Sequence, residues 1–363
     1  MNSPSFGLYI HIPFCSVKCA FCDFAAYPGL MKTIPDYLSA LEIEMQFHHN
    51  KKIETVFVGG GTPTVLDPSE LKRLFSSIHE NFRVLPNSEI SVECNPESVS
   101  IEKLTVMKQQ GVNRLSFGLQ AIQDSLLQRL GRQHNFAQFL EVYQLAQSMD
   151  FSNLNIDLMY GLPQQTFEDW KMTIEKIIQL QPQHLSAYAL TVEDQSSFHF
   201  QNIELQSDPQ VEMYEYAALQ LENAGYSHYE ISNFAKPGYE CKHNLRYWKN
   251  QNVIGIGASA SGYENGVRKK NHSRIFPYME GMKKAEPMIE EEYQLSAEEQ
   301  IGENLMLALR LKEGADWDDL TQKHYGAVFN QFKQSGHLYF ENKKVRLTRE
   351  GWLISNQIFQ ELV

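Results

Sequence analysis

The chain has 363 residues, 42% of them hydrophobic and 21% charged, which is enough for one large globular domain and one or two smaller ones. Its formal net charge of −12 and the lack of a long basic block argue against non-specific nucleic-acid binding. No apolar run reaches the roughly 18 residues of a membrane span and the first residues do not resemble a signal peptide, so we expect a cytoplasmic protein without a membrane span, with peripheral membrane association left open.

The first half of the chain alternates short apolar runs with amphipathic stretches. The runs are rich in β-branched or aromatic residues, are bounded by Gly, Pro, Asn or Asp, and cover residues 8–12, 55–58, 89–93, 114–118, 153–158 and 184–190. Six strands separated by helices predict a parallel sheet with right-handed crossovers. The pattern fits an α/β fold with an incomplete, TIM-like (β/α)6 barrel, and a doubly wound sheet is the alternative.

Helix start signals lie between these runs. Asp67 offers an N-cap, Pro68 suits the first helical position and Glu70 completes a capping box. Thr166 with Asp169 resembles another capped start. Both signals support crossover helices after strands.

The alternation of strands and helices ends near residue 191. Residues 195–210 are polar and we expect them to form a loop, whereas 211–224 has the pattern of a helix that Gly225 ends. The stretch 226–263 is rich in Gly, Asn and aromatic residues, and a charged segment, 264–295, follows.

The end of the chain predicts a small α+β unit. Ser296 and Glu299 form a capping box before an apolar helix face. Residues 338–340 and 345–347 flank a polar tetrapeptide as in a hairpin, and Thr348 is placed to cap a last helix. Helices plus one hairpin indicate a winged-helix-like region. We favour a packing role for it over nucleic-acid binding because the chain is acidic.

We therefore divide the chain into three regions. They are the partial barrel at 1–200, a connecting region at 201–290 and the small C-terminal domain at 291–363.

Three of the five cysteines lie within eight residues, directly after the first predicted strand. Cys15, Cys19 and Cys22 have the spacing C-x3-C-x2-C, with no fourth cysteine close behind. Three thiolates satisfy three irons of a [4Fe–4S] cubane and leave the fourth open, whereas electron carriers usually have four cysteine ligands. An open iron suits the coordination of a substrate or cofactor. A structural zinc site completed by a histidine such as His11 is the alternative.

This spacing, with an aromatic residue before the last cysteine, resembles the signature of the radical SAM superfamily. The string from Tyr9 to Phe24 resembles one branch of it, the oxygen-independent coproporphyrinogen III oxidase family and its haem-chaperone (HemW-type) relatives. The resemblance implies a [4Fe–4S] cluster whose open iron is chelated by S-adenosylmethionine (SAM). It also implies an electron donor that reduces the cluster, so that SAM is cleaved to a 5′-deoxyadenosyl radical.

Polar and small residues follow the predicted strands at the ends where barrel enzymes build their sites. The triple glycine at 59–61 lets a ligand approach the backbone closely, although on its own it is typical of a flexible turn. A lone Asp157 in an apolar strand needs a partner. The resemblance assigns SAM contacts to these residues and to others along the same edge: Tyr9, Phe21, Gly60, Gly61, Thr62, Glu93, Gln120, Arg132 and Asp157.

Two departures separate this chain from the oxidases that it resembles. The oxidases carry a further cysteine two positions after the third, where this chain has Phe24. They also have a longer segment before the cluster, whereas Cys15 lies close to the first residue here. Both departures favour the haem-chaperone branch.

A later motif points the same way. The string Cys241-Lys-His243-Asn-Leu-Arg-Tyr247-Trp248 resembles the HNxxYW motif of the haem-chaperone branch. His243 offers an imidazole to haem iron, Cys241 a thiolate, and Tyr247 and Trp248 flat apolar surface for a porphyrin. Without the resemblance, a histidine beside aromatic residues is more often a satisfied core residue.

Three functions remain open at this level. The favoured one is a chaperone that binds haem and passes it to haem-accepting respiratory proteins. The second is oxygen-independent coproporphyrinogen III oxidation with a 5′-deoxyadenosyl radical, and the third is another radical SAM reaction. Whether the protein is an enzyme is thus undecided by the sequence.

Overall fold

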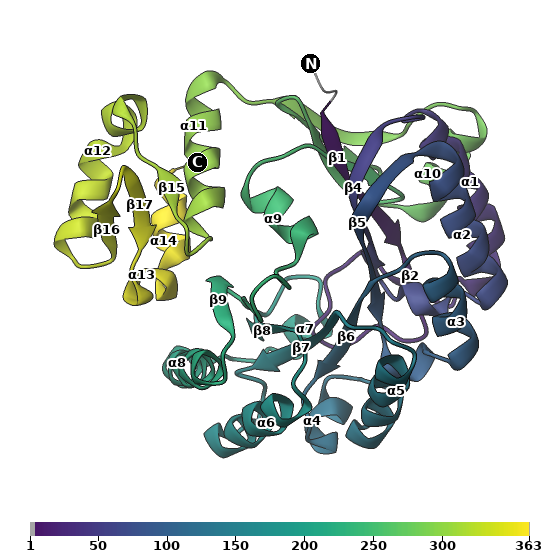
Figure 1. The fold of residues 1–363 in the computed structure, drawn as a ribbon, viewed down its shortest axis with the longest axis horizontal. Coiled ribbons are helices and arrows are strands. Elements are labelled where there is room, and N and C mark those ends of the chain that lie inside the picture. The colour runs from purple at the N-terminus through teal and green to yellow at the C-terminus, as the bar shows by residue number, and fades with distance from the viewer. Residues whose placement is uncertain (1–3, 363) are drawn as a thin grey trace.

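The computed structural model describes residues 4–362 and shows a strongly curved sheet with helices on its outer face and a separate C-terminal lobe (Figure 1). Six parallel strands form the centre of this sheet and are neighbours in chain order: β1 (Ser5–Ile12), β4 (Lys52–Gly60), β5 (Arg83–Cys94), β6 (Arg114–Gln120), β7 (Leu154–Tyr160) and β8 (His184–Ala189). A doubly wound sheet would reverse its strand order at a switch point, and no reversal occurs among these strands. The predicted incomplete (β/α)6 barrel is confirmed.

Helices connect these strands along the outer face. They are α1 (Ile34–Gln46), α2 (Pro68–Asn81), α3 (Ile101–Gln109), α4 (Asp124–Arg129), α5 (Phe136–Ser148) and α6 (Phe167–Leu180). Short 3₁₀ turns cover Met31–Thr33, Pro63–Val65 and Pro96–Ser98. The capping boxes at Asp67 and Thr166 are confirmed, since each side chain accepts a hydrogen bond from the backbone three residues on. Apolar residues of both layers pack into one core between sheet and helices.

Further strands extend both edges of the barrel sheet. The edge at β1 continues through β11 (Val253–Ile256), β12 (Ser261–Glu264), β13 (Val267–Asn271) and β14 (Ile289–Gln294), and the edge at β8 continues through β10 (Asn233–Ala235) and β9 (Ser227–Glu230). The helices of this part are α7 (Ser197–Phe200), α8 (Ser207–Asn223), α9 (Lys242–Trp248) and α10 (Ile275–Lys283). A small pair, β2 (Phe14–Cys15) with β3 (Tyr27–Pro28), lies near the end of β1. The strands of the region at 201–290 therefore belong to the same sheet as the barrel.

The expected loop at 195–210 was wrong in part. Ser196 accepts a hydrogen bond from His199 N at 3.2 Å and starts α7, and α8 begins at Ser207 rather than at residue 211. The start of α7 depends on a polar side chain that also suits a loop, whereas α8 begins without a side-chain cap.

The C-terminal lobe has its own apolar core and three-stranded sheet. Its elements are α11 (Ala297–Leu309), β15 (Ala315–Asp316), α12 (Asp319–Gln334), β16 (Leu338–Glu341), β17 (Lys344–Leu347), α13 (Arg349–Leu353) and α14 (Ser355–Gln360). The predicted hairpin is the pair β16 and β17, Ser296 caps α11 and Thr348 caps α13. The winged-helix-like region is confirmed.

Helix α9 lies on the concave side of the curved sheet, between the barrel and the C-terminal lobe (Figure 1). Its first turn is fixed by Glu89 of β5, whose carboxylate accepts from Lys242 N at 3.1 Å and from His243 N at 3.0 Å. Within residues 4–362, no helix combines the length and the apolar character that crossing a membrane requires.

Candidate functional site

A single cavity of about 590 Å³ runs from the carboxyl ends of the barrel strands to α9. Its size is in the range of small-molecule sites. At one end it is lined by Cys15, Cys19 and Cys22, and at the other by His243 and Tyr247. The structure thus brings the cysteine motif and part of the HNxxYW-like motif to the same cavity, although more than 200 residues separate them in the sequence.

The cysteine loop follows β1 and is held by backbone hydrogen bonds. Cys22 N donates to Cys19 O at 3.2 Å, and Ala20 N donates to Leu130 O at 2.9 Å, which ties the loop to the segment after α4. Cys15 is buried, and Cys19 and Cys22 are half-buried on the cavity wall. Burial raises the pKa of Cys22 to about 11, so a positive metal centre must replace its proton on binding.

The donor set fits a cubane. All three thiols are free and line one cavity. Among residues 4–362, no three Cys, His, Asp or Glu side chains converge tightly enough to hold a single metal ion. A [4Fe–4S] cubane does not require the three ligands to meet at one point, because each thiolate binds a different iron.

The glycine loop packs directly against the cysteine loop. Gly61 N donates to Ile12 O at 2.9 Å and Thr62 N donates to Phe14 O at 2.8 Å. A Cβ on Gly61 would lie 2.6 Å from Phe14 O and 3.0 Å from Cys15 Sγ, so only glycine fits there. The backbone of this loop therefore faces the cavity beside the cysteines.

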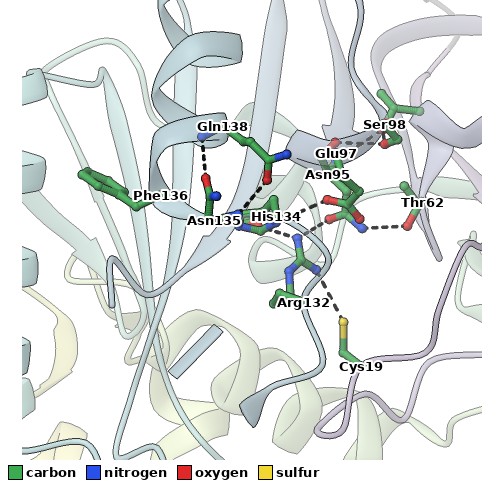
Figure 2. Close-up of polar contacts among 12 residues, drawn as sticks. Cys19, Thr62, Asn95, Glu97, Ser98, Arg132, His134, Asn135, Phe136 and Gln138 are labelled. Atoms are coloured by element: carbon green, nitrogen blue, oxygen red, sulfur yellow. Dashed lines mark hydrogen bonds and ion pairs between the residues drawn. The ribbon is translucent and has the colours of Figure 1, made fainter. Parts of the chain in front are cut away.

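Polar side chains reach two of the cysteine sulfurs. Thr62 Oγ1 lies 3.3 Å from Cys15 Sγ. Arg132 Nη1 donates to Cys19 Sγ at 3.5 Å (Figure 2). Arg132 also donates through Nη2 to Gly118 O at 2.6 Å, which holds its guanidinium over the end of β6. Arg132 is therefore a buried side chain of the site and not a surface residue.

Two carboxyl groups, those of Glu93 and Asp157, line the cavity. Glu93 Oε2 accepts from Gly60 N at 3.0 Å, and Asp157 accepts from Asn155 at 2.7 Å and from Ser116 at 3.3 Å. Burial, and then the charge of Asp157, raise the pKa of Glu93 to about 8. Burial raises the pKa of Asp157 as well. Asp157 thus has the hydrogen-bonding partners that its place in an apolar strand demanded.

The remaining predicted SAM residues also line this cavity. The Tyr9 hydroxyl forms a hydrogen bond with His11 Nδ1 at 2.9 Å. Phe21 packs against a small apolar cluster. Gln120, at the end of β6, has a left-handed φ of +74°. A non-glycine residue in that conformation is uncommon and often marks a functional site.

Only part of the HNxxYW-like motif lines the cavity, namely His243, Asn244 and Tyr247. The side chain of His243 is 1% exposed and both ring nitrogens have partners, with Nδ1 2.9 Å from Thr55 Oγ1 and Nε2 3.3 Å from Tyr247 Oη. Its ring stacks on Phe57. Burial lowers the pKa of His243 to about 3, so the imidazole is neutral.

The other two predicted haem residues do not line the cavity. Cys241 is fully buried, its Sγ lies 3.7 Å from Glu89 Oε1, and burial raises its pKa to about 12. Trp248 packs under Arg310 of the C-terminal lobe, with 4.5 Å between the guanidinium carbon and the ring centroid. In this conformation the four residues do not form one surface for a porphyrin.

Several residues of the cavity were missed in the sequence. Asn95 bridges Thr62 and Arg132, and Arg114 is buried at the cavity floor with Nε and Nη1 unpartnered within residues 4–362. Arg114 and the serines of neighbouring strands occupy inward positions of the two-residue strand period, which is a usable signal. Nothing local marked Asn95, because its partners come from two other loops.

Comparisons with known proteins agree with this geometry. A model described as the Radical SAM superfamily matches residues 9–177, and one described as the HemN C-terminal domain matches residues 295–354. A relative from Bacillus subtilis (strain 168) named "Heme chaperone HemW" is 38% identical over 371 residues, with 97% of each chain covered. One of the same name from Lactococcus lactis subsp. lactis (strain IL1403) is 36% identical over 367 residues, with 98% of this chain and 96% of the relative covered.

A solved structure shares the fold over almost the whole chain. It is coproporphyrinogen III oxidase (HemN) from Escherichia coli, described as a radical SAM enzyme, with a TM-score of 0.87 and 23% identity over 99% of this chain and 90% of that one.

Proposed function

Because the chain belongs to the HemW family of the radical SAM superfamily, we propose that it is a haem chaperone that binds haem and a SAM-ligated [4Fe–4S] cluster and transfers haem to respiratory proteins. The near full-length similarity to relatives named for haem chaperone activity carries this proposal. Phe24 supports it, since this residue stands where the oxidases have a further cysteine and is 60% exposed at the mouth of the cavity.

In this proposal Cys15, Cys19 and Cys22 hold the cluster. The bound cluster supplies one-electron reduction of SAM when a donor delivers the electron. The chain itself binds and orients SAM. The backbone of Gly60 and Gly61 offers its polar groups, Arg132 offers a cation for the SAM carboxylate, and Glu93 and Asp157 accept hydrogen bonds deeper in the cavity.

Haem ligation by His243 requires a change at α9. The ring of His243 is enclosed, and its Nε2 is occupied by the Tyr247 hydroxyl. An iron can take that nitrogen only if the hydroxyl is displaced and α9 moves away from the sheet. The imidazole is already neutral, which is the form that binds iron.

The deciding experiment compares haem binding with porphyrinogen turnover in the reconstituted full chain. We expect one haem per chain, no conversion of coproporphyrinogen III to protoporphyrinogen IX with SAM and a reductant, and haem release to an apocytochrome. His243→Ala should change the Soret band, and Tyr247→Phe should strengthen haem binding several-fold by freeing Nε2. Cys241→Ala is the matched variant for the second ligand candidate and should leave the band in place, because that thiol is enclosed next to Glu89.

Three results would contradict the proposal. Robust decarboxylation of coproporphyrinogen III by the wild type would favour the oxidase function. Absence of haem binding would exclude a haem chaperone. A purified protein without about four irons and four sulfides per chain, or one in which Cys15→Ala, Cys19→Ala and Cys22→Ala keep them, would exclude the cluster.

A further inference from the structure

Asn95, directly after β5, contacts both side chains that reach cysteine sulfurs (Figure 2). Its Nδ2 lies 2.8 Å from Thr62 Oγ1, and its Oδ1 lies 2.7 Å from Arg132 Nη2. Thr62 in turn contacts Cys15 at 3.3 Å and Arg132 contacts Cys19 at 3.5 Å. One amide therefore joins the donors that face two of the three cysteines.

The orientation of this amide is determined by its partners. The guanidinium of Arg132 has donors only, so the Asn95 atom that faces it must be the oxygen. The NH2 group must then face Thr62. The backbone of Asn95 is fixed as well, because its N donates to Thr64 Oγ1 at 3.2 Å.

This orientation directs the hydrogen of the Thr62 hydroxyl. Thr62 Oγ1 accepts from Asn95 Nδ2, so its own hydrogen remains free to point at Cys15 Sγ. In the same way, Asn95 and Gly118 O hold one side of the Arg132 guanidinium and leave Nη1 for Cys19 Sγ. A cluster-bound thiolate is an acceptor, and hydrogen bonds to such sulfurs raise the reduction potential of a cluster.

We propose that Asn95 is a positioning residue that maintains hydrogen bonds to the thiolates of Cys15 and Cys19 and thereby makes the cluster easier to reduce. The inference rests on the proposed function in one respect only, namely that Cys15, Cys19 and Cys22 hold a [4Fe–4S] cluster. It concerns the one-electron reduction itself and is independent of whether SAM is consumed or haem is bound.

Asn95→Asp is the most informative variant because it is isosteric. A carboxylate still accepts from Arg132 but cannot donate, so the Thr62 hydroxyl must donate to it and turn its hydrogen away from Cys15. We expect the equilibrium constant for one-electron reduction to fall at least tenfold, which corresponds to a potential more negative by about 59 mV. An anaerobic redox titration of the reconstituted full chain, followed by the EPR signal of the reduced cluster, measures this.

A double-mutant cycle separates the hydrogen bond from the added charge. Thr62→Val alone should lower the potential, and Thr62→Ser should keep the wild-type value. On the Thr62→Val background, Asn95→Asp should shift the potential less than it does in the wild type, since only the charge is left to act. Asn135→Asp is the matched control, because it changes the same groups at the N-cap of α5, preserves the cap and contacts no cysteine.

The outcomes distinguish this inference from the proposed function. A wild type that assembles no cluster overturns both. The inference alone is overturned if Asn95→Asp with a fully loaded cluster has the reduction potential of the wild type. It is also overturned if Asn95→Asp shifts the reduction potential equally in the presence and absence of the Thr62 hydroxyl. If Asn95→Asp does not load iron, Asn95→Ala tests the same point without added charge, and an unchanged potential in that variant overturns the inference too.

Discussion

At the scale of single residues, the cavity combines buried charges with partners that come from different strands. Glu93 accepts a hydrogen bond from Gly60 N, but it also lies near Asp157, and both carboxyl pKa values are raised by burial. An acid that the folded protein prefers to keep protonated costs stability once the solution pH favours ionisation. When ionised, these two carboxyl groups therefore destabilise the ligand-free fold.

We expect Glu93→Gln to stabilise the ligand-free protein above neutral pH. The unfolded chain loses this proton near pH 4.5, whereas the folded protein keeps it up to about pH 8. Between these values the folded state binds more protons, so stability falls as the pH rises. The amide cannot ionise, and the gain at pH 8 should be about 1–3 kcal/mol.

Denaturant unfolding of the apoprotein at several pH values measures this effect. Glu141→Gln on the exposed face of α5 is the control and should leave the pH dependence unchanged. A Glu93→Gln protein with the wild-type pH dependence would show that Glu93 ionises normally.

At the scale of elements, the cysteine loop and the glycine loop form one unit. Backbone hydrogen bonds join 12–14 to 61–62, and no side chain separates the two segments at Gly61. A ligand that contacts one loop is consequently positioned relative to the other. The glycine is required by this close approach, and the left-handed φ of +112° at Gly60 adds a second constraint.

Gly61→Ala should disrupt the cysteine loop itself, and not SAM binding alone. The added methyl group would lie 2.6 Å from Phe14 O, so the backbone beside Cys15 must move. We expect most of the iron and sulfide to be lost after anaerobic reconstitution. Gly326→Ala on α12 is the control, because its methyl group has room, and it should load fully. If Gly61→Ala instead binds the full complement of iron and sulfide, the two loops can move apart to accommodate the methyl group.

At the scale of the whole molecule, α9 connects the cavity to the C-terminal lobe. Its His243 end faces the barrel, while Trp248 at its other end packs under Arg310 of the segment after α11. That segment also pairs with β9, since Ile231 N donates to Arg310 O at 3.2 Å. The movement of α9 that we propose for exposing His243 would therefore also disturb the contact between Trp248 and the lobe.

We expect Arg310→Ala to loosen the lobe without affecting the cysteine end. Loss of the cation–π contact with Trp248 should cost about 1–2 kcal/mol of unfolding free energy, because the contact is largely desolvated. Chemical unfolding and limited proteolysis would reveal it, with iron content unchanged. Arg129→Ala, at an exposed position, should shift stability by less than about 0.5 kcal/mol. If Arg310→Ala unfolds with the same free energy as the wild type, contacts other than the one between Arg310 and Trp248 hold the lobe to the barrel.

The sequence by itself determined the six barrel strands, the capped helices and the cysteine motif. These features follow from local rules: short apolar runs bounded by turn residues, N-cap chemistry such as that of Asp67, and a ligand spacing contained in eight residues. The glycine loop could be placed beside the cysteines because parallel strands end at the same edge of the sheet.

Only the tertiary structure decided how distant segments meet. The strands β9 to β14 are short and pair with β8 or β1 across long stretches of chain, so their places depend on non-local hydrogen bonds. The burial of His243, the separation of Cys241 and Trp248 from the cavity, and the bridge from Asn95 to Thr62 and Arg132 likewise involve side chains far apart in sequence. Local patterns carry no information on such contacts, because the chain gains their free energy only after distant segments have been brought together.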